Sequence, residues 1–381
     1  MPKQGGYFTY MAEKNNTMTK IEHTNSMHAF KAFKKQFDET FLTYIEEKQR
    51  GYKTFIEPKS NIEYAFNYLS KYAVWGKRIR PYLLDLTYRL CHGNETNYHI
   101  IQKLWYILEM FQLFLLIHDD ITDRGVIRHD ISAYHRHLAE IYNEERAGTS
   151  QAIILWDIIY TRVRQDLASL QLPYTLLEQF GGRVTHVAIG QMQDIDLSYQ
   201  DIGATEQTIF TKDMLKTATY TCIMPMMLGA QLAGATTEQV DMIVGWAHDL
   251  WITFQMRDDL LDFGITHTNK TMFSDHAEGN QTYLLARLRD KATPAEKAYI
   301  EKTRKQTLST QEQQKLYEIY QKYNIIGHAI EEVNSRLDIS LQRCKEVFKD
   351  ANHEIIEEIR YICAFLYLTQ PDNNDNLPLK K

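Results

Sequence analysis

The stretch that determines the fold is YHIIQKLWYILEMFQLFLLIHDDITD, residues 98–123. Apolar residues occupy almost every helical face of it, which is the pattern of a helix buried in a core. The stretch ends in a cluster of acids, Asp119, Asp120 and Asp123. Its most apolar part, residues 104–117, contains Glu109 and Gln112 and is shorter than the roughly 20 residues that a membrane span needs. We therefore expect a buried core helix and no transmembrane segment.

Helical periodicity continues on both sides of this stretch, and no alternating pattern persists long enough to predict a sheet. Glycine and proline are scarce, with 17 and 8 residues in 381, which argues against a collagen-like chain, a low-complexity chain or a small-turn β-sandwich. We expect a flexible arm over residues 1–25, one helical domain over 26–369 and a disordered tail over 370–381. The helical patterns cover residues 26–50, 62–69, 81–90, 98–123, 140–170, 173–196, 206–232, 237–263 and 274–368.

Composition excludes several classes of protein. The net charge is −6, so a nucleic-acid binder that relies on overall positive charge is not expected. The N-terminus has no apolar segment of the kind found in signal peptides. The cysteines are far apart, form no CxxC pair and suit a reducing cytoplasm rather than a zinc site or a disulfide framework. They are Cys91, Cys222, Cys344 and Cys363.

The acid cluster occurs twice. DDITD at 119–123 and DDLLD at 258–262 share the pattern DDxxD, and each follows an apolar run. Residues i and i+4 lie on one helix face with i+1 beside them, so each motif presents several carboxylates together. Such carboxylates repel one another unless a cation neutralises them, and a hard cation such as Mg²⁺ fits them. Because Mg²⁺ commonly bridges carboxylates to phosphates, we expect a diphosphate ligand.

Basic residues complete this picture. GKRIRP at 76–81 concentrates three cations in a predicted turn. Arg128 follows the first acid motif, Lys216 begins a run of small residues, and Lys270 follows the second motif. Arginine binds phosphate with a planar fork and lysine binds it as a point charge, so these side chains are candidate diphosphate ligands.

At this point the sequence resembles the trans-isoprenyl diphosphate synthases, the polyprenyl synthetase family that includes farnesyl and geranylgeranyl diphosphate synthases. The resemblance extends from about Tyr72 to Thr282, with the motifs in family order and spacing. The motifs are GKRIRP at 76–81, Gln112 with HDDITD at 118–123, Arg128 with His135, GQMQDID at 190–196, KTA at 216–218, FQMRDDLLD at 254–262, and Lys270 with Asp275.

The resemblance implies an antiparallel helical bundle around a deep central cavity, the isoprenoid synthase fold, usually as a homodimer. It implies that isopentenyl diphosphate binds Lys77, Arg80 and Gln112. The allylic diphosphate would bind Arg128, Lys216 and Lys270. Thr217 and Gln255 would lie near the allylic cation that forms when the diphosphate departs, and His118 would support the metal site. Three Mg²⁺ ions would be held by Asp119, Asp120, Asp123, Asp258, Asp259 and Asp262.

The chain also departs from the family pattern. His129 stands where the family has a second arginine for isopentenyl diphosphate, and Asn280 stands where EGKxT has lysine. Neither can bind phosphate as those cations do, because histidine can be neutral at pH 7 and asparagine carries no charge. Ser132 replaces a proline, and Trp156 stands where the family usually has glycine before Asp157.

The residues before the first acid motif bear on product length. Phe114 lies five residues before Asp119, about 7 Å along a helix axis, and Leu115 follows it. The resemblance implies that a bulky side chain at this depth blocks the growing tail, so we expect a product of about C20. Phe111, Phe114 and Leu115 would form the floor of the cavity, although the same three residues could serve only as core.

Three functions remain open at this stage. The first is a chain-elongating synthase, favoured by all six aspartates, by GKRIRP and by Gln112. The second is a prenyltransferase that modifies a peptide such as a pheromone, favoured by His129 because a peptide acceptor needs no second diphosphate site. The third is a non-catalytic partner subunit of a two-chain synthase. A terpene cyclase is disfavoured because its second metal motif usually mixes Asn, Ser or Thr with acid, whereas this one is DDLLD.

Overall fold

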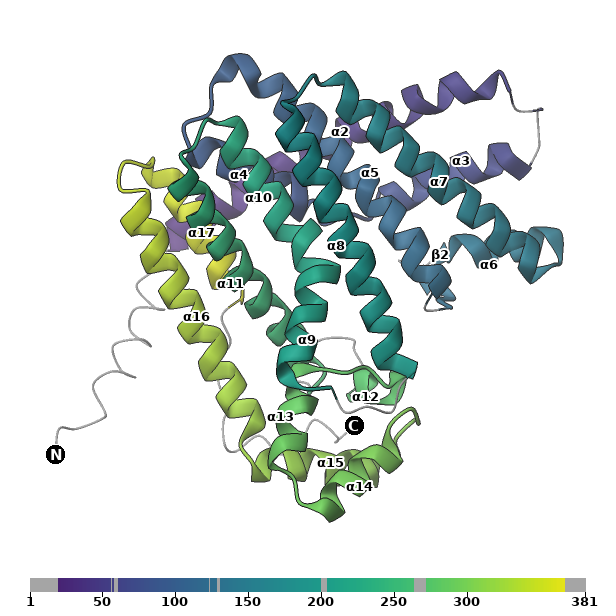
Figure 1. The fold of residues 1–381 in the computed structure, drawn as a ribbon, viewed down its shortest axis with the longest axis vertical. Coiled ribbons are helices and arrows are strands. Elements are labelled where there is room, and N and C mark those ends of the chain that lie inside the picture. Colours follow the sequence, from purple (N-terminus) through teal and green to yellow (C-terminus); the bar gives the residue numbers. More distant parts are fainter. Residues whose placement is uncertain are drawn as a thin grey trace. The chain divides into compact units, whose positions relative to one another are not determined.

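The computed structural model describes residues 20–55, 57, 61–122, 124–128, 131–199, 204–263 and 272–366. These residues are almost entirely helical, which confirms the all-α prediction (Figure 1). The chain divides into two compact units. Unit 1 comprises residues 1–178 and 228–234, and unit 2 comprises residues 179–227 and 235–381.

Unit 1 contains the first acid motif and is built around one buried helix, α5. Its described elements are α2 (Lys20–Lys53), α3 (Asn61–Ala73), α4 (Ile79–Leu90), the 3₁₀ turn η1 (Glu95–Asn97), α5 (Tyr98–Thr122), β1 (Ile127–Arg128), β2 (Ile131–Ser132), α6 (Tyr134–Tyr142), α7 (Glu145–Ser169) and the first turn of α8 (Tyr174–Tyr199).

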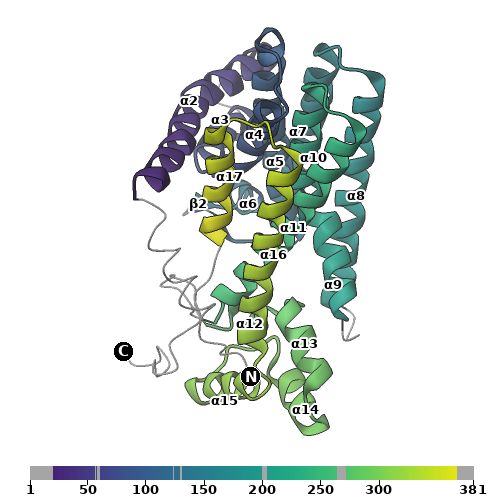
Figure 2. The same cartoon turned by 90° about the vertical axis from the view of Figure 1, so that its left-hand side faces the viewer.

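Unit 2 contains the second acid motif at the end of α11. Figure 2 shows α16 running beside α11 and beginning near the short helix α15. The described elements are the rest of α8, α9 (Glu206–Asp213), the π-helix η2 (Met214–Ile223), α10 (Met224–Leu232), which ends in unit 1, α11 (Thr237–Leu261), α12 (Ser274–Glu278), α13 (Tyr283–Lys291), α14 (Pro294–Thr303), α15 (Thr310–Lys322), α16 (Ile325–Val347) and α17 (His353–Leu366).

Helix α5 is the centre of the core of unit 1, as its sequence predicts. Leu104 and Phe111 are fully buried, and Trp105 packs edge-to-face on Phe33 of α2 with ring centroids 4.8 Å apart. By length and composition, one helix of the described chain could cross a membrane, the segment from Glu95 to Thr122, and 61% of its most apolar window is buried. Because core helices of soluble proteins share these properties, the predicted absence of a transmembrane segment stays a prediction.

Several element boundaries differ from the sequence expectation. Helix α2 begins at Lys20, so the last residues of the predicted arm are helical. The pattern over 140–170 is two helices, because Asn143 adopts a left-handed conformation with φ of 52° and ends α6. Helix α4 begins at Ile79 rather than at Pro81, which still lies in the first turn, where a missing N–H is tolerated.

Two local structures were absent from the sequence expectation altogether. The connector after the first acid motif contains a short antiparallel hairpin, in which Arg128 of β1 pairs with Ile131 of β2. The pattern over 206–232 is three successive segments rather than one helix, and the middle one, η2, is π-helical. Inserted π-helical turns are rare and frequently mark functional sites.

Candidate active site

The first acid motif lies at the C-terminal end of α5, where a helix dipole disfavours negative charge. Asp120 is buried, with 3% of its side chain exposed, whereas Asp119 is 29% exposed. Arg128 neutralises both, with Nη2 2.6 Å from Oδ1 of Asp120 and 3.2 Å from Oδ2 of Asp119. Tyr72, near the end of α3, donates its hydroxyl to Asp120. The hairpin thus positions the cation that stabilises this acidic helix end.

The electrostatics of this cluster reflect burial and pairing. Burial alone would lower the pKa of the Arg128 guanidinium, but its hydrogen bond to Asp120 and the nearby carboxylates raise that pKa. Burial and the hydrogen bond to Asp120 raise the pKa of the Tyr72 hydroxyl. Both groups therefore remain protonated beside the carboxylates. Asp123 and His129 lie outside the described residues.

The three cations of GKRIRP have different surroundings. Arg78 is buried with φ of 60°, and its guanidinium lies 2.7 Å from Glu109 of α5 and 2.7 Å from Asp38 of α2. Gly76 leaves room for it, because a Cβ there would lie 2.0 Å from Nη1 of Arg78. Arg78 therefore joins α2 to α5. Lys77 is exposed and Arg80 is half-buried, and their predicted role as phosphate ligands stays a prediction.

In the second acid motif, as in the first, an accessible aspartate is followed by a buried one. Asp258 is exposed, and Asp259 is 4% exposed. Asp259 accepts hydrogen bonds from Nε2 of Gln255 at 3.0 Å and from the backbone N–H of Tyr283 at 3.1 Å. Burial raises the pKa of Asp259 well above its usual value, and the charge of Asp213 raises it further. A divalent cation near this motif would offset the repulsion.

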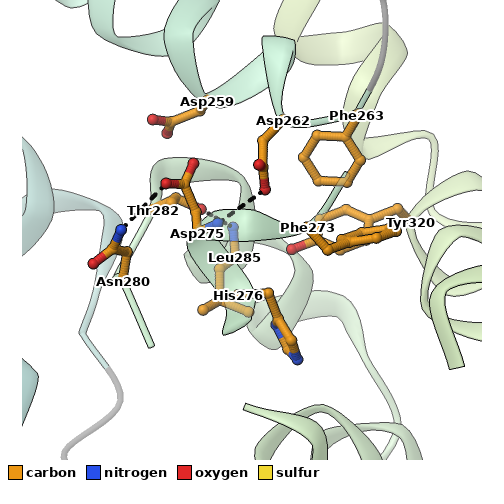
Figure 3. Close-up of a pocket in the computed structure, with 10 residues that line it drawn as sticks. All are labelled: Asp259, Asp262, Phe263, Phe273, Asp275, His276, Asn280, Thr282, Leu285 and Tyr320. Atoms are coloured by element: carbon orange, nitrogen blue, oxygen red, sulfur yellow. Dashed lines mark hydrogen bonds between the residues drawn. The ribbon is translucent and has the colours of Figure 1, made fainter. Parts of the chain in front are cut away.

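Asp262 has a structural role that the sequence does not reveal. Its Oδ1 accepts from the backbone N–H and the hydroxyl of Ser274, at 2.9 and 2.6 Å, and its Oδ2 accepts from the N–H of Asp275 at 3.3 Å. It therefore satisfies free N–H groups at the start of α12. Figure 3 shows Asp259 and Asp262 above Asp275 and Asn280 in a small pocket, with Phe263, Phe273 and Tyr320 on one side.

Lys216 lies on the π-helix η2 and pairs with α8. Its Nζ is 2.6 Å from Oδ2 of Asp194, and Nζ of Lys212 is 3.1 Å from Oδ1 of Asp194. Burial would raise the pKa of Asp194, but Lys212 and Lys216 hold it below its usual value. Gly190 permits this approach, because a Cβ there would lie 2.2 Å from the backbone nitrogen of Lys216. Thr217, beside Lys216, is half-buried, and Lys270 lies outside the described residues.

The predicted floor residues are partly core. Phe111 is fully buried and Phe114 is 5% exposed, whereas Leu115 is half-buried. The rings of Phe111 and Phe114 are stacked with centroids 5.4 Å apart. Gln112 of α5 is half-buried, and its Oε1 finds no hydrogen-bond donor within the described part of the chain.

Carboxylate oxygens at both motifs have the chemistry that Mg²⁺ prefers, and the like-charge crowding around Asp259 favours a cation there. Within the described ranges, however, no three Asp, Glu, His or Cys side chains form a preassembled metal site. The donors fit Mg²⁺ in type, with few protein ligands per ion, which suits an ion that retains waters and binds substrate phosphates.

Sequence reasoning assigned no role to Tyr72 and Lys212, and it named Asp194 only as part of a motif. It counted Arg78 among the candidate diphosphate ligands, whereas the structure buries Arg78 between two acids. The only local signals were glycines beside them in the motifs, Gly76 before Arg78 and Gly190 before Asp194. A glycine often marks a position where two segments of the chain approach closely.

The family model for polyprenyl synthetase matches residues 61–322 of this chain. A geranylgeranyl diphosphate synthase of Sulfolobus acidocaldarius is 27% identical over 260 residues, covering 66% of this chain and 74% of that one. An octaprenyl diphosphate synthase of Escherichia coli is 28% identical over 227 residues, covering 59% and 66%. A solved geranylgeranyl pyrophosphate synthase of Corynebacterium glutamicum, complexed with isoprenyl diphosphate and magnesium, is similar with a TM-score of 0.75 at 24% identity, covering 87% and 98%.

Proposed function

Because this chain belongs to the polyprenyl synthetase family and has the isoprenoid synthase fold, we propose that it condenses isopentenyl diphosphate with an allylic prenyl diphosphate to an all-trans product of about C20. The general activity, that of a trans-prenyl diphosphate synthase, follows from the family. Product length is the finer part of the proposal, because the relatives include geranylgeranyl and octaprenyl diphosphate synthases.

One observation carries the proposal. Each acid motif pairs an accessible carboxylate, Asp119 or Asp258, with a buried one, Asp120 or Asp259. The accessible member of each pair can bind an ion, while the buried member is held in place by hydrogen bonds. Asp123 and Asp262 would complete the motifs, and we propose about three Mg²⁺ ions per site.

The residues of the chain would divide the chemistry as follows. Mg²⁺, when bound, would supply electrostatic stabilisation of the departing diphosphate. Arg128, Lys216 and Lys270 would hold the diphosphate while its carbon–oxygen bond breaks and the electron pair leaves with it. Thr217 and Gln255 would present dipoles to the allylic cation. No side-chain nucleophile is needed.

The acceptor would be positioned by a second set of side chains. Lys77, Arg80 and Gln112 would orient isopentenyl diphosphate so that its double bond attacks the allylic cation. The new carbon–carbon bond leaves a second cation, which loses a proton to the released diphosphate. Gln112 would contact the diphosphate through its side-chain amide N–H groups, because the diphosphate oxygens accept hydrogen bonds.

The test is an assay of purified protein with Mg²⁺, radiolabelled isopentenyl diphosphate and each of dimethylallyl, geranyl, farnesyl and geranylgeranyl diphosphate. Products are sized after dephosphorylation. We expect elongated prenyl alcohols from the wild type and a loss of roughly 10²–10³ in kcat for Asp258→Asn, since that is the usual cost of a lost transition-state contact. Asp241→Asn, an exposed acid earlier on α11, is the matched control and should keep full activity.

A second candidate is transfer of the prenyl group to a peptide, and Asn280 favours it. The Asn280 amide donates to Asp275 at 3.2 Å and to Glu278 at 3.1 Å, so it holds two acids together and offers no cation to a phosphate. His129 removes a further cation from the sequence. Tight Mg²⁺-dependent binding of one allylic diphosphate without elongation would support this candidate against the synthase.

We also propose a homodimer in the cytoplasm. Along α8, Ile189, Met192 and Ile195 are exposed by 42%, 67% and 36% and share one helix face, which supports an apolar interface. The four cysteines, free of disulfides, support a reducing compartment, and fractionation of cells followed by immunoblotting would test the location.

A further inference from the structure

An indole on α7 lies against α5 immediately before the first acid motif. The ring of Trp156 is stacked on Phe114 with centroids 4.9 Å apart and planes at 11°. The same indole lies 5.0 Å from the ring of His118 at 30°. Because α5 and α7 run side by side in unit 1 (Figure 1), this contact belongs to one compact unit.

The indole reaches closer to the acids than Phe114 does. His118 directly precedes Asp119, and Phe114 lies four residues further down, about 6 Å along the helix. A ring that contacts both therefore covers the whole of this stretch. A prenyl tail that leaves Asp119 along this side of α5 meets Trp156 before it reaches the depth of Phe114.

The exposure of the side chains also indicates that a ligand would meet Trp156 before Phe114. Phe114 is buried, at 5% exposed, and is covered on its other contacts by Phe111 and Tyr160, with centroids 5.4 and 5.0 Å away. Trp156 is half-buried, as is His118, whose ring it contacts. Trp156 is therefore more exposed than Phe114, one face of which the indole covers.

We propose that Trp156 is the residue that sets the maximum length of the prenyl chain in this site, with Phe114 acting as its support. This inference rests on the proposed function, because it needs an allylic diphosphate bound at the first acid motif. It assigns length control to α7 in addition to α5. It also applies to a peptide prenyltransferase, where Trp156 would limit the length of the prenyl donor.

The first experiment compares the products of Trp156→Leu, Trp156→Ala and Phe114→Ala with those of the wild type. We expect both Trp156 variants to lengthen the longest product by at least one isoprene unit, and Phe114→Ala to lengthen it less. Trp156→Leu retains an apolar side chain and so keeps the test valid if Trp156→Ala fails to fold. Lengthening in Phe114→Ala but not in Trp156→Leu would overturn the proposal.

Two controls separate length from general damage. Ile154→Ala removes an exposed apolar side chain from the same helix outside the stack and should leave product length unchanged. Trp156→Phe keeps a ring on Phe114, and it loses no hydrogen bond within the described structure, since the indole N–H has no acceptor there. It should give products close to those of the wild type, and a wild-type pattern in Trp156→Leu as well would contradict the proposal.

A binding experiment does not depend on condensation. Unreactive thio-diphosphate analogues of geranyl, farnesyl and geranylgeranyl diphosphate are titrated with Mg²⁺ into the wild type and Trp156→Leu. For each protein we take the ratio of the dissociation constant of the geranyl analogue to that of the geranylgeranyl analogue. We expect this ratio to be about tenfold higher for the variant than for the wild type. Equal length preference in both proteins would overturn the role of Trp156. No Mg²⁺-dependent binding of any analogue to the wild type would overturn the proposed function itself, and this inference with it.

Discussion

Among single residues, Arg128 binds the same carboxylates as a metal ion at the first acid motif would. Its guanidinium already neutralises Asp119 and Asp120, so an ion at these carboxylates must displace it or share them. The freed guanidinium would then be available to the diphosphate. One arginine could thus stabilise the ion-free helix end and, in the function we propose, also bind the diphosphate.

Arg128→Gln should therefore destabilise the metal-free protein and increase its response to Mg²⁺. Loss of the pair leaves Asp120 buried with Tyr72 as its remaining described partner, which we expect to cost about 2 kcal/mol, below the usual value for a buried pair because Arg128 is 26% exposed. The measurement is thermal unfolding in EDTA and in excess Mg²⁺. Arg124→Gln, an exposed arginine of the same connector, is the control. If Mg²⁺ raises the unfolding temperature of the wild type and of Arg128→Gln by the same amount, Arg128 and the ion do not compete for these carboxylates.

His276 gives the pH dependence that is simplest to predict. Burial, together with nearby Arg304, lowers the pKa of its imidazole from 6.5 to about 4. Because the folded pKa lies below the unfolded one, the unfolded chain takes up a proton first as the pH falls. The stabilisation is complete above pH 6.5 and declines toward pH 4, by at most about 1.4 kcal/mol per pH unit.

The variant His276→Gln isolates this contribution. Denaturant unfolding of the two proteins between pH 7.5 and 4 should show a difference in unfolding free energy that is constant above about pH 7 and shrinks as the pH falls. A difference that does not change with pH would mean that His276 is not buried as a neutral ring against Thr303, where its Nε2 lies 3.0 Å from the hydroxyl.

At the scale of elements, the packing of α8 against η2 depends on one glycine. Gly190→Ala would place a Cβ 2.2 Å from the nitrogen and 2.6 Å from the Cα of Lys216, which are backbone atoms that cannot rotate away. We expect a loss of about 1–3 kcal/mol in unfolding free energy, as in other overpacked sites. The shift of η2 should also move Lys216 away from Asp194 and reduce kcat.

The matched control lies on the same helix. A Cβ at Gly182 meets no atom within 4 Å, so Gly182→Ala should stabilise the protein by about 0.5–1 kcal/mol through helix propensity alone. Chemical denaturation of both variants measures the difference. If Gly190→Ala is as stable as Gly182→Ala, α8 and η2 do not approach each other closely at Gly190.

Helices α5 and η2 show what the sequence could and could not predict. Helix α5 and both acid motifs were predictable because their periodicity and spacing involve only residues that are close together in the sequence. The π-helical form of η2 was not, because it depends on backbone hydrogen bonds between residues five apart, such as that from the N–H of Met224 to the carbonyl of Thr219. Nor was the burial of Arg78 or the stack on Trp156, since both depend on residues distant in the sequence.

At the scale of the whole molecule, each compact unit contributes one acid motif, and the two units are formed by discontinuous stretches of chain. The crossing from unit 2 to unit 1 and back occurs within residues 224–237, through α10 and the turn that follows. Neither unit by itself carries all of the aspartates that the resemblance assigns to Mg²⁺.

The proposed homodimer gives a prediction for the whole assembly. Met192 is 67% exposed in the middle of the apolar stripe of α8, and in a twofold interface one substitution is present twice. Met192→Glu would bury two unpaired charges of like sign, so we expect the dimer dissociation constant to rise by at least about 100-fold, which corresponds to roughly 3 kcal/mol. Light scattering over a dilution series measures it. Tyr174→Glu changes a side chain that is 76% exposed at the start of the same helix, outside the stripe, and should leave the dimer intact. A wild type that is monomeric at all concentrations, or a Met192→Glu variant that dimerises like the wild type, would mean that this stripe is not the interface.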